Sequence, residues 1–162
     1  MGLPYPGCPA IDRLSRAGNP AAIDFPRALA RDGNYEFSFS GLKSAVLNYI
    51  NSEKMKGYGL NTADIAASFQ CAVVEVLVYK SFEAVREAGR DTLVLAGGVA
   101  ANAALEKRLR EAAAAQGIRY LYPPPHLCTD NAAMIACRGA YQAMAGKYSD
   151  LFLNAVPGLD FG

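Results

Sequence analysis

Histidine is nearly absent from this 162-residue sequence, which contains only His126. A metal site built from two histidines of one copy of the chain is therefore excluded. The four cysteines include no pair with the Cys-x-x-Cys spacing, so they predict reduced thiols of a cytosolic protein and not a disulfide framework. They are Cys8, Cys71, Cys128 and Cys137.

An excess of charge of either sign is also lacking, because the formal net charge is +1. Such a chain has no strong positive field, so it is not expected to bind nucleic acid tightly on its own. No apolar run reaches the roughly 18 residues of a membrane span, and the start, Met1–Pro4, lacks the basic and apolar parts of a signal peptide. We expect no membrane association and a cytoplasmic location.

Apolar residues are plentiful, since 52% of the chain is hydrophobic, and they predict one domain with a core. Their spacing predicts a short helix over 10–17, a helix that begins at Ser40, and a long central helix over 63–88. The alternation of aromatic residues over 35–39 predicts a short extended segment. Its rings could form a base-stacking platform, although core packing is the commoner explanation.

The second half of the chain alternates strands and helices. Residues 93–96 predict a strand buried on both faces, 118–122 a second strand, and a helix capped by Asn102 lies between them. This order predicts parallel pairing. A last helix, capped by Thr129 or Asp130, follows a triple proline.

The Gly97-Gly98 turn is the first candidate site. Glycine lets a ligand approach the backbone, and the helix start after it offers N–H groups to an anion or a polar oxygen. A tight turn with no ligand is the alternative. Because parallel strands end at one edge of a sheet, this turn and the loop at Asp130 are expected to share a crevice.

Other polar residues have structural and functional explanations side by side. Asp12 complements the dipole of a helix start. Asp130 is either a helix cap or one oxygen ligand of a metal. Cys128 could be a nucleophile only with His126 as its base, a pairing that no motif supports.

Five segments in order resemble one family, the tRNA threonylcarbamoyladenosine transferases (TsaD type, once labelled O-sialoglycoprotein endopeptidases). The resemblance covers nearly the whole chain. The sequence contains no His-Glu-x-x-His motif and no set of catalytic-triad residues, so it does not support the old peptidase label. The segments are 2–12 (GLPYPGCPAID), 32–43 (DGNYEFSFSGLK), 63–70 (ADIAASFQ), 95–102 (LAGGVAAN) and 128–136 (CTDNAAMIA).

The resemblance implies an α/β fold, part of an actin-like (ASKHA, RNase-H-like) fold, of which this chain is the C-terminal lobe with a helical insertion. Residues 1–62 would be the insertion, 63–145 the core and 146–162 a tail. The implied activity is transfer of threonylcarbamoyl from threonylcarbamoyl-AMP to the exocyclic amine of the adenosine 3′ of a tRNA anticodon. The implied partners are these two substrates and the accessory proteins of the modification complex.

The resemblance also assigns residue roles. Asp130 matches a ligand of the family's iron or zinc. Asn102, with the backbone of Gly97 and Gly98, matches the place that receives the adenylate. Substrate contacts are implied for two further residues: Asp12, and Cys8, which stands where the family has glycine. No residue here is expected to be a catalytic acid, base or nucleophile.

Two departures limit these expectations. The family's two metal-binding histidines and its first lobe have no counterpart in this sequence, so we expect weak or no metal binding and little or no activity of the chain alone. A non-catalytic interaction or regulatory fragment is the alternative function. Half of a two-lobed fold exposes apolar surface, which predicts self-association.

Overall fold

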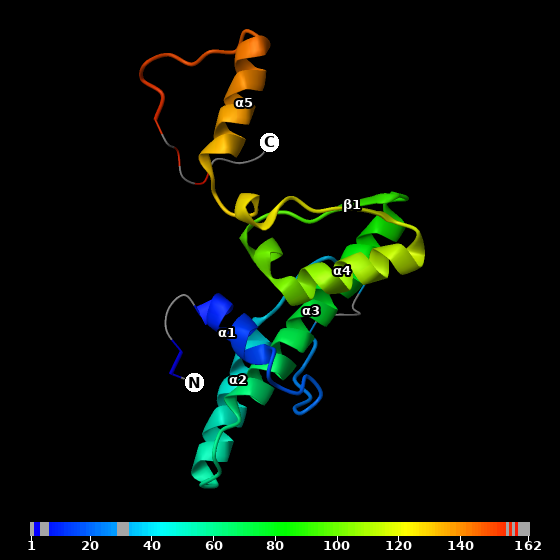
Figure 1. Ribbon diagram of the computed structural model, residues 1–162, viewed down its shortest axis with the longest axis vertical. Coiled ribbons are helices and arrows are strands. Elements are labelled where there is room, and N and C mark those ends of the chain that lie inside the picture. Colours follow the sequence, from blue (N-terminus) through cyan, green and yellow to red (C-terminus); the bar gives the residue numbers. More distant parts are fainter. Residues whose placement is uncertain (1, 4–6, 29–32, 155, 157, 159–162) are drawn as a thin grey trace.

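The computed structural model describes residues 2–3, 7–28, 33–154, 156 and 158, and Figure 1 shows their arrangement. It is an α/β structure with a small parallel sheet. The elements in chain order are α1 (Gly7–Ser15), α2 (Ser40–Met55), α3 (Thr62–Glu87), β1 (Thr92–Val94), the 3-10 helix η1 (Gly98–Ala101), α4 (Ala103–Gln116), β2 (Arg119–Leu121), the 3-10 helix η2 (Pro125–Leu127) and α5 (Ala132–Met144).

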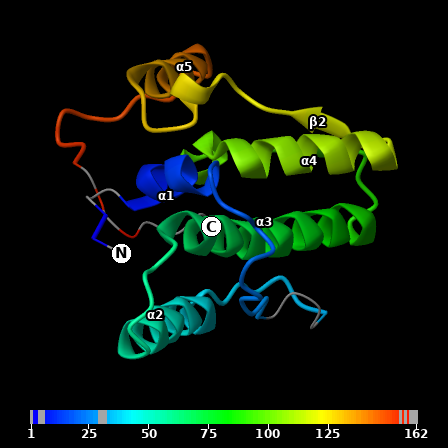
Figure 2. The same ribbon diagram turned by 60° about the horizontal axis from the view of Figure 1, so that its bottom comes forward.

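Helix α3 is the centre of the core, as its length and apolar content predict. Figure 2 shows it between α2 and α4. One apolar cluster joins it to α2 and the preceding loop, and a second joins it to α4. The first contains Phe25, Leu42, Ile50, Ile65 and Ala72, and the second contains Val74, Phe82, Leu105, Leu109 and Ala113.

By length and composition α3 could also cross a membrane, since an 18-residue window has a mean hydropathy of 1.4. Half of that window is buried inside the structure, with α2 and α4 packed on the helix. A central core helix has the same composition as a membrane span, so this property has an explanation within the fold.

Helix α1 begins at Gly7, earlier than the predicted residue 10, and packs along α3. The chain then crosses α3 so closely that only glycine fits at position 18. A Cβ on Gly18 would overlap the backbone carbonyl group of Ala63 and lie 2.8 Å from the nitrogen of Asp64.

Strands β1 and β2 pair in parallel, as predicted, with Leu93 opposite Tyr120. The prediction of a strand buried on both faces is wrong, because Val94 is 60% exposed. Within the described ranges the sheet has two strands. Among these residues no third strand joins the sheet beside β1 or β2.

Helix α5 stands apart from the other helices (Figure 1), and none of its residues is buried. Its cap is Asn131, whose Oδ1 accepts the N–H of Met134 at 3.0 Å. The predicted caps, Thr129 and Asp130, are wrong, because the helix begins at Ala132 and the residue immediately before it, Asn131, is the cap.

Residues 35–39 form no strand, and their rings are not in the core. Tyr35, Phe37 and Phe39 are exposed, and the two phenylalanine rings stack on each other. The backbone here is held by the buried Lys80, whose Nζ donates to the carbonyl of Glu36 at 2.5 Å.

Candidate functional site

The backbone of the Gly97-Gly98 turn, which follows β1, is accessible to a ligand. Gly97 has φ +90°, a conformation that side chains disfavour, whereas Gly98 has no positive φ. A Cβ on either residue would meet no atom within 4 Å. Both glycines therefore border open space, as the hypothesis of ligand access to the backbone requires.

The helix start after the turn differs from the expectation in one respect. A 3-10 turn, η1, begins at Gly98 and precedes α4, and it already uses two backbone N–H groups. That of Ala100 bonds to the carbonyl of Gly97, and that of Asn102 to the carbonyl of Val99, both at 3.0 Å. Fewer donors remain for a ligand than at a regular α-helix start.

Asn102 caps α4 as predicted. Its Oδ1 accepts the N–H of Leu105 at 2.9 Å, and its Nδ2 donates to Oε1 of Gln70 at 3.0 Å. Both ends of the amide are thus bonded within the protein. These bonds fix the orientation of the Asn102 side chain, and a ligand contact from it would use the second N–H of the amide or the second lone pair of its oxygen.

Gln70 is a residue that reasoning from the sequence missed. Its Nε2 donates to Oγ of Ser15 at 2.9 Å, and that hydroxyl donates to the backbone carbonyl of Asp12 at 2.8 Å. A chain of hydrogen bonds therefore runs from α1 through α3 to the cap of α4. The sequence did contain an indication that Gln70 matters. It is a polar residue in the most apolar stretch of α3, and it ends one of the five family-like segments.

Two predicted site residues lie on α1. The side chain of Cys8 is exposed. The carboxylate of Asp12 accepts a hydrogen bond from Arg16 at 2.7 Å, one helical turn later. Asp12 thus has the structural partner that its position on a helix suggests, and any nucleotide contact would be additional to this ion pair.

The loop after β2 returns to η1. The O–H of Tyr122 donates to the carbonyl of Ala100 at 3.1 Å. Since β1 and β2 are parallel, the Gly97-Gly98 turn and this loop leave the sheet from the same edge. The structure does not bring Asp130 into a closed site, because that residue is exposed.

Tyr120, beside Tyr122, has a buried hydroxyl that finds no hydrogen-bond partner among the residues that the structure describes. Burial raises its pKa to about 12. Burial also raises the pKa of Tyr122, with a smaller contribution from a hydrogen bond with Cys128. The buried Cys128 lies close to proline carbonyls, 3.8 Å from that of Pro124, and His126 is exposed. A nucleophile with a paired base is not formed here.

The residues present do not fit a complete metal site. Among the described residues, no three His, Cys, Asp or Glu side chains gather closely enough to hold an ion. Asp130 would provide one oxygen ligand, and a single carboxylate holds iron or zinc weakly. Weak metal binding therefore stays a prediction.

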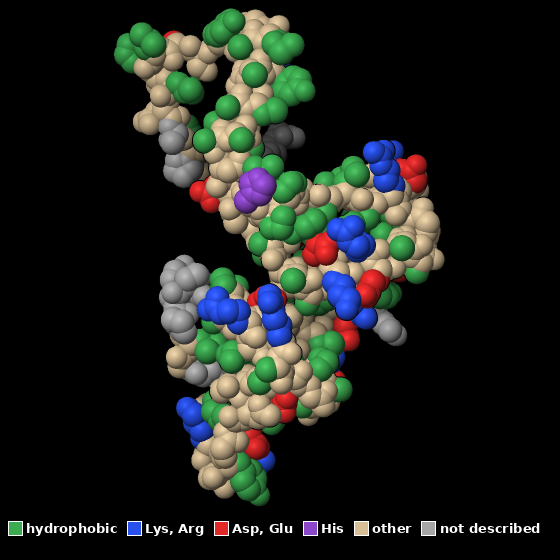
Figure 3. Space-filling view, in the orientation of Figure 1, with side chains coloured by type: hydrophobic (Ala, Val, Ile, Leu, Met, Phe, Trp, Pro, Cys, Tyr) green, Lys and Arg blue, Asp and Glu red, His purple; other side chains and the backbone are tan. Residues whose placement is uncertain are grey.

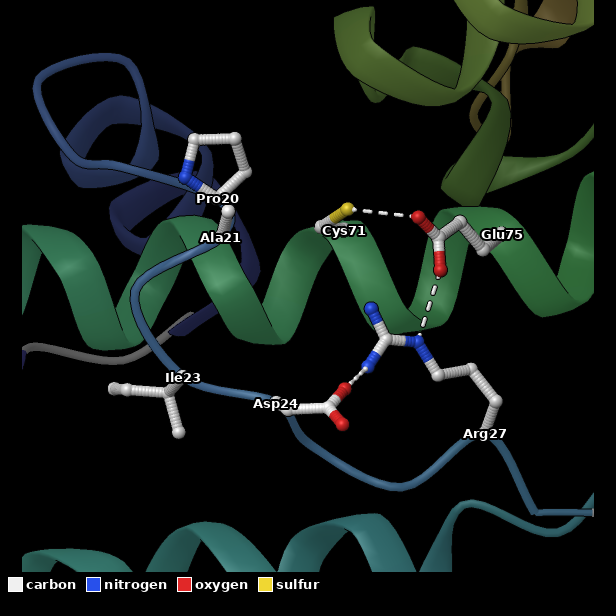
Figure 4. A pocket seen from close by; sticks show the side chains of 7 residues that line it. All are labelled: Pro20, Ala21, Ile23, Asp24, Arg27, Cys71 and Glu75. Atoms are coloured by element: carbon white, nitrogen blue, oxygen red, sulfur yellow. Dashed lines mark hydrogen bonds and ion pairs between the residues drawn. The ribbon is translucent and has the colours of Figure 1, made fainter.

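A cavity of about 310 Å³ lies elsewhere, between α3 and the segment that joins α1 to α2 (Figure 4). Glu75 accepts Nε–H of Arg27 at 2.9 Å and the thiol of Cys71 at 3.2 Å, and Arg27 also pairs with Asp24. Other lining residues are Pro20, Ala21 and Ile23. None of the predicted site residues lines this cavity.

Both carboxylates of this cavity, Asp24 and Glu75, are paired with the single cation Arg27. Burial and the hydrogen bond to Glu75 raise the pKa of the Cys71 thiol. Burial alone would raise the pKa of Glu75, but the hydrogen bonds from Cys71 and Arg27 lower it. The thiol therefore stays protonated at neutral pH and is a poor nucleophile. The group ties the 19–28 segment to α3.

Comparison with known proteins gives a consistent result. The family profile described as TsaD, tRNA N6-adenosine threonylcarbamoyltransferase, matches residues 1–137. The protein of that name from Desulfitobacterium hafniense (strain Y51) is 54% identical over 160 residues, which are 99% of this chain and 47% of the relative. Those of Clostridioides difficile (strain 630) and Moorella thermoacetica are 53% and 50% identical, over 47% and 46% of their lengths. The chain spans about half the length of the curated relatives it matches.

Proposed function

Since this chain belongs to the tRNA N6-adenosine threonylcarbamoyltransferase family, we propose that it supplies one part of the site that transfers threonylcarbamoyl to a tRNA adenosine. The family implies an ASKHA-type fold, with which the observed helices and parallel strands are consistent. Because the chain spans about half the length of its relatives, the whole reaction is assigned to this chain together with the remaining family sequence.

The hydrogen-bond chain through Gln70 is the observation that best supports this role. It connects α1, which carries Cys8 and Asp12, to the cap that sets the Gly97-Gly98 turn. Residues that the family resemblance assigns to one substrate thus belong to one connected unit. Their part is to bind and orient the adenylate of threonylcarbamoyl-AMP.

The proposed reaction depends mainly on how the two substrates are positioned relative to each other. The adenosine amine attacks the carbonyl carbon of the carbamoyl group, the bond from that carbon to the phosphate oxygen breaks, AMP leaves and the amine loses a proton. Open backbone at Gly97 and Gly98 allows close approach by an oxygen of the substrate. No step is assigned to iron or zinc, and Asp130 would contribute a single ligand oxygen.

We expect the chain alone to show no turnover, because it has one histidine and lacks the two that the family resemblance assigns to the metal. The test uses the purified chain with threonylcarbamoyl-AMP and tRNA. It is repeated after co-expression with the part of the Desulfitobacterium hafniense relative that this chain does not match. Activity only in the second case supports the proposal, and full activity of the chain alone contradicts it.

The alternative function, a non-catalytic interaction or regulatory fragment, gives a different result. Such a fragment binds the second polypeptide without restoring transfer. A Gly98→Ala variant separates the two further, since it should reduce restored transfer but leave assembly unchanged. A cytoplasmic location and the family's accessory proteins as partners remain part of this proposal.

A further inference from the structure

The side chain of Gln70 connects the helix that carries Asp12 to the helix that follows the Gly97-Gly98 turn. Helices α1 and α4 both pack on α3, and both lie above it in the view of Figure 2. Among the described residues no hydrogen bond joins α1 to α4 directly, and the bond between Gln70 and Asn102 is the one that joins α3 to α4 or its cap. Apart from apolar packing, the position of α1 relative to the turn is therefore set through Gln70.

The hydrogen bonds of this path can run in one direction only. Its first donor is the backbone N–H of Leu105, which cannot accept, so the capping atom of Asn102 is the oxygen. The nitrogen of Asn102 then faces Gln70 and requires Oε1 there, which leaves Nε2 for Ser15. The Ser15 oxygen accepts that bond, and its O–H donates to the carbonyl of Asp12, which cannot donate. All four bonds are between 2.8 and 3.0 Å long.

The direction of the path requires glutamine at position 70. The side chain must accept a hydrogen bond at one atom and donate one at another. Glutamate has no donor, so Ser15 would have to turn its O–H away from Asp12, and methionine would form neither bond. Gln70 is half-buried in an apolar stretch of α3, where an amide without partners would cost stability.

Positive side chains lie on both helices that the path connects. In the space-filling view, Lys and Arg side chains lie over α1 and over α4, with Asp and Glu side chains among them, whereas the part that carries α5 has few charges (Figure 3). Arg13 belongs to α1, and Lys107, Arg108 and Arg110 belong to α4. Such side chains favour the approach of a phosphate group, the anionic part of an adenylate.

We propose that Gln70 is a positioning residue of the adenylate site, which holds α1 and the Gly97-Gly98 turn at the separation that the adenylate requires. This inference rests on the proposed function, because the family resemblance assigns the substrate contacts to Asp12 and the turn. Gln70 itself touches no substrate and acts through Ser15 and Asn102. The adenylate is held equally before and during transfer, so its loss of alignment weakens binding and leaves the transfer step unchanged.

The test uses the co-expressed two-part protein, with AMP as a stable probe of the adenylate site. Titration calorimetry measures the Kd of AMP, and transfer assays give kcat and the KM for threonylcarbamoyl-AMP. Gln70→Met, which removes both hydrogen bonds, should raise the Kd and the KM about tenfold. The kcat should stay within about twofold, because the interaction is the same in the ground state and the transition state.

Variants of Ser15 test the α1 end of the path. Ser15→Ala should raise the Kd of AMP about threefold, because one bond of Gln70 is lost. Ser15→Thr keeps a hydroxyl and should keep the affinity. The double variant Gln70→Met/Ser15→Ala should bind AMP no more weakly than Gln70→Met alone, since the bond is already absent. Gln116→Met is the control, because Gln116 is exposed at the end of α4, and it should change no constant.

The results separate this inference from a structural role and from the proposed function. A lower thermal midpoint of Gln70→Met with an unchanged Kd of AMP would overturn the inference, because Gln70 would then only support the fold. Equal losses in Ser15→Ala and Ser15→Thr would also overturn it, and this pair decides alone if Gln70→Met does not fold. An unsubstituted two-part protein that binds no AMP would contradict the proposed function, and the inference with it.

Discussion

Two neighbouring tyrosines differ in one hydrogen bond. Their rings are nearly parallel, with centroids 6.5 Å apart. The hydroxyl of Tyr122 donates to the carbonyl of Ala100, and that of Tyr120 is buried with no partner in the described part of the chain. Tyr120→Phe should therefore leave the free energy of unfolding unchanged or raise it by up to about 1 kcal/mol. Tyr122→Phe should lower it by about 1 kcal/mol, since it leaves a carbonyl unbonded. Urea unfolding measures both, and an equal loss in the two variants would contradict the assignment.

The same pair predicts a pH dependence. The pKa of Tyr120 is raised from 10 to about 12 in the folded chain. Above pH 10 the unfolded chain therefore ionises first, and the free energy of unfolding falls as the pH rises from 10 to 12. Tyr120→Phe should flatten this fall when unfolding is followed across that range, whereas an unchanged slope would show that other groups cause it.

Gly18 is the residue at which the packing of α1 on α3 depends on a missing Cβ. Gly18→Ala should lower the free energy of unfolding by about 2 kcal/mol or more, because backbone atoms of α3 cannot move aside easily. Gly41→Ala is the matched control in α2, where a Cβ meets no atom within 4 Å. It should leave stability unchanged or raise it by up to about 1 kcal/mol. Equal effects would mean that the close crossing is absent in solution.

At the scale of elements, two asparagine side chains each cap the start of a helix, but the two helices differ in how they are packed. Asn102 caps the packed α4 and Asn131 caps the unpacked α5. Asn102→Ala should lower the free energy of global unfolding by about 2 kcal/mol, since it also breaks the bond to Gln70. Asn131→Ala should speed amide exchange in α5 with little change in global unfolding. Circular dichroism and hydrogen exchange distinguish these outcomes, and a global loss in both would show that α5 is packed.

At the scale of the whole molecule, the glycine turn can be tested without disturbing the fold. Gly98→Ala should leave the thermal midpoint of the chain within about 2 °C, because the site is open and φ is not positive. In the co-expressed two-part protein it should reduce threonylcarbamoyl transfer at least about tenfold by blocking approach to the backbone. Gly59→Ala, also with open space around its Cβ and no positive φ, is the control and should leave transfer unchanged.

Much of the fold can be predicted from local sequence patterns. The 3.6-residue period marks α2, α3 and α4, the strand–helix–strand order predicts the parallel pair, and the cap at Asn102 follows from its place before a helix. These features depend on residues within a few positions of one another. Five family-like segments in order sufficed to indicate the family, which the comparisons then showed.

Other features arise from contacts between segments far apart in the chain, and only the tertiary structure reveals them. Lys80 holds the carbonyl of Glu36, 44 positions away, in a segment whose aromatic rings are exposed and not in the core. Gln70 joins α1 to the cap of α4 in the same way. The exposure of Val94 and α5 depends on which elements are present to cover them. Periodicity specifies the face that an element can bury, whereas burial itself requires a partner surface.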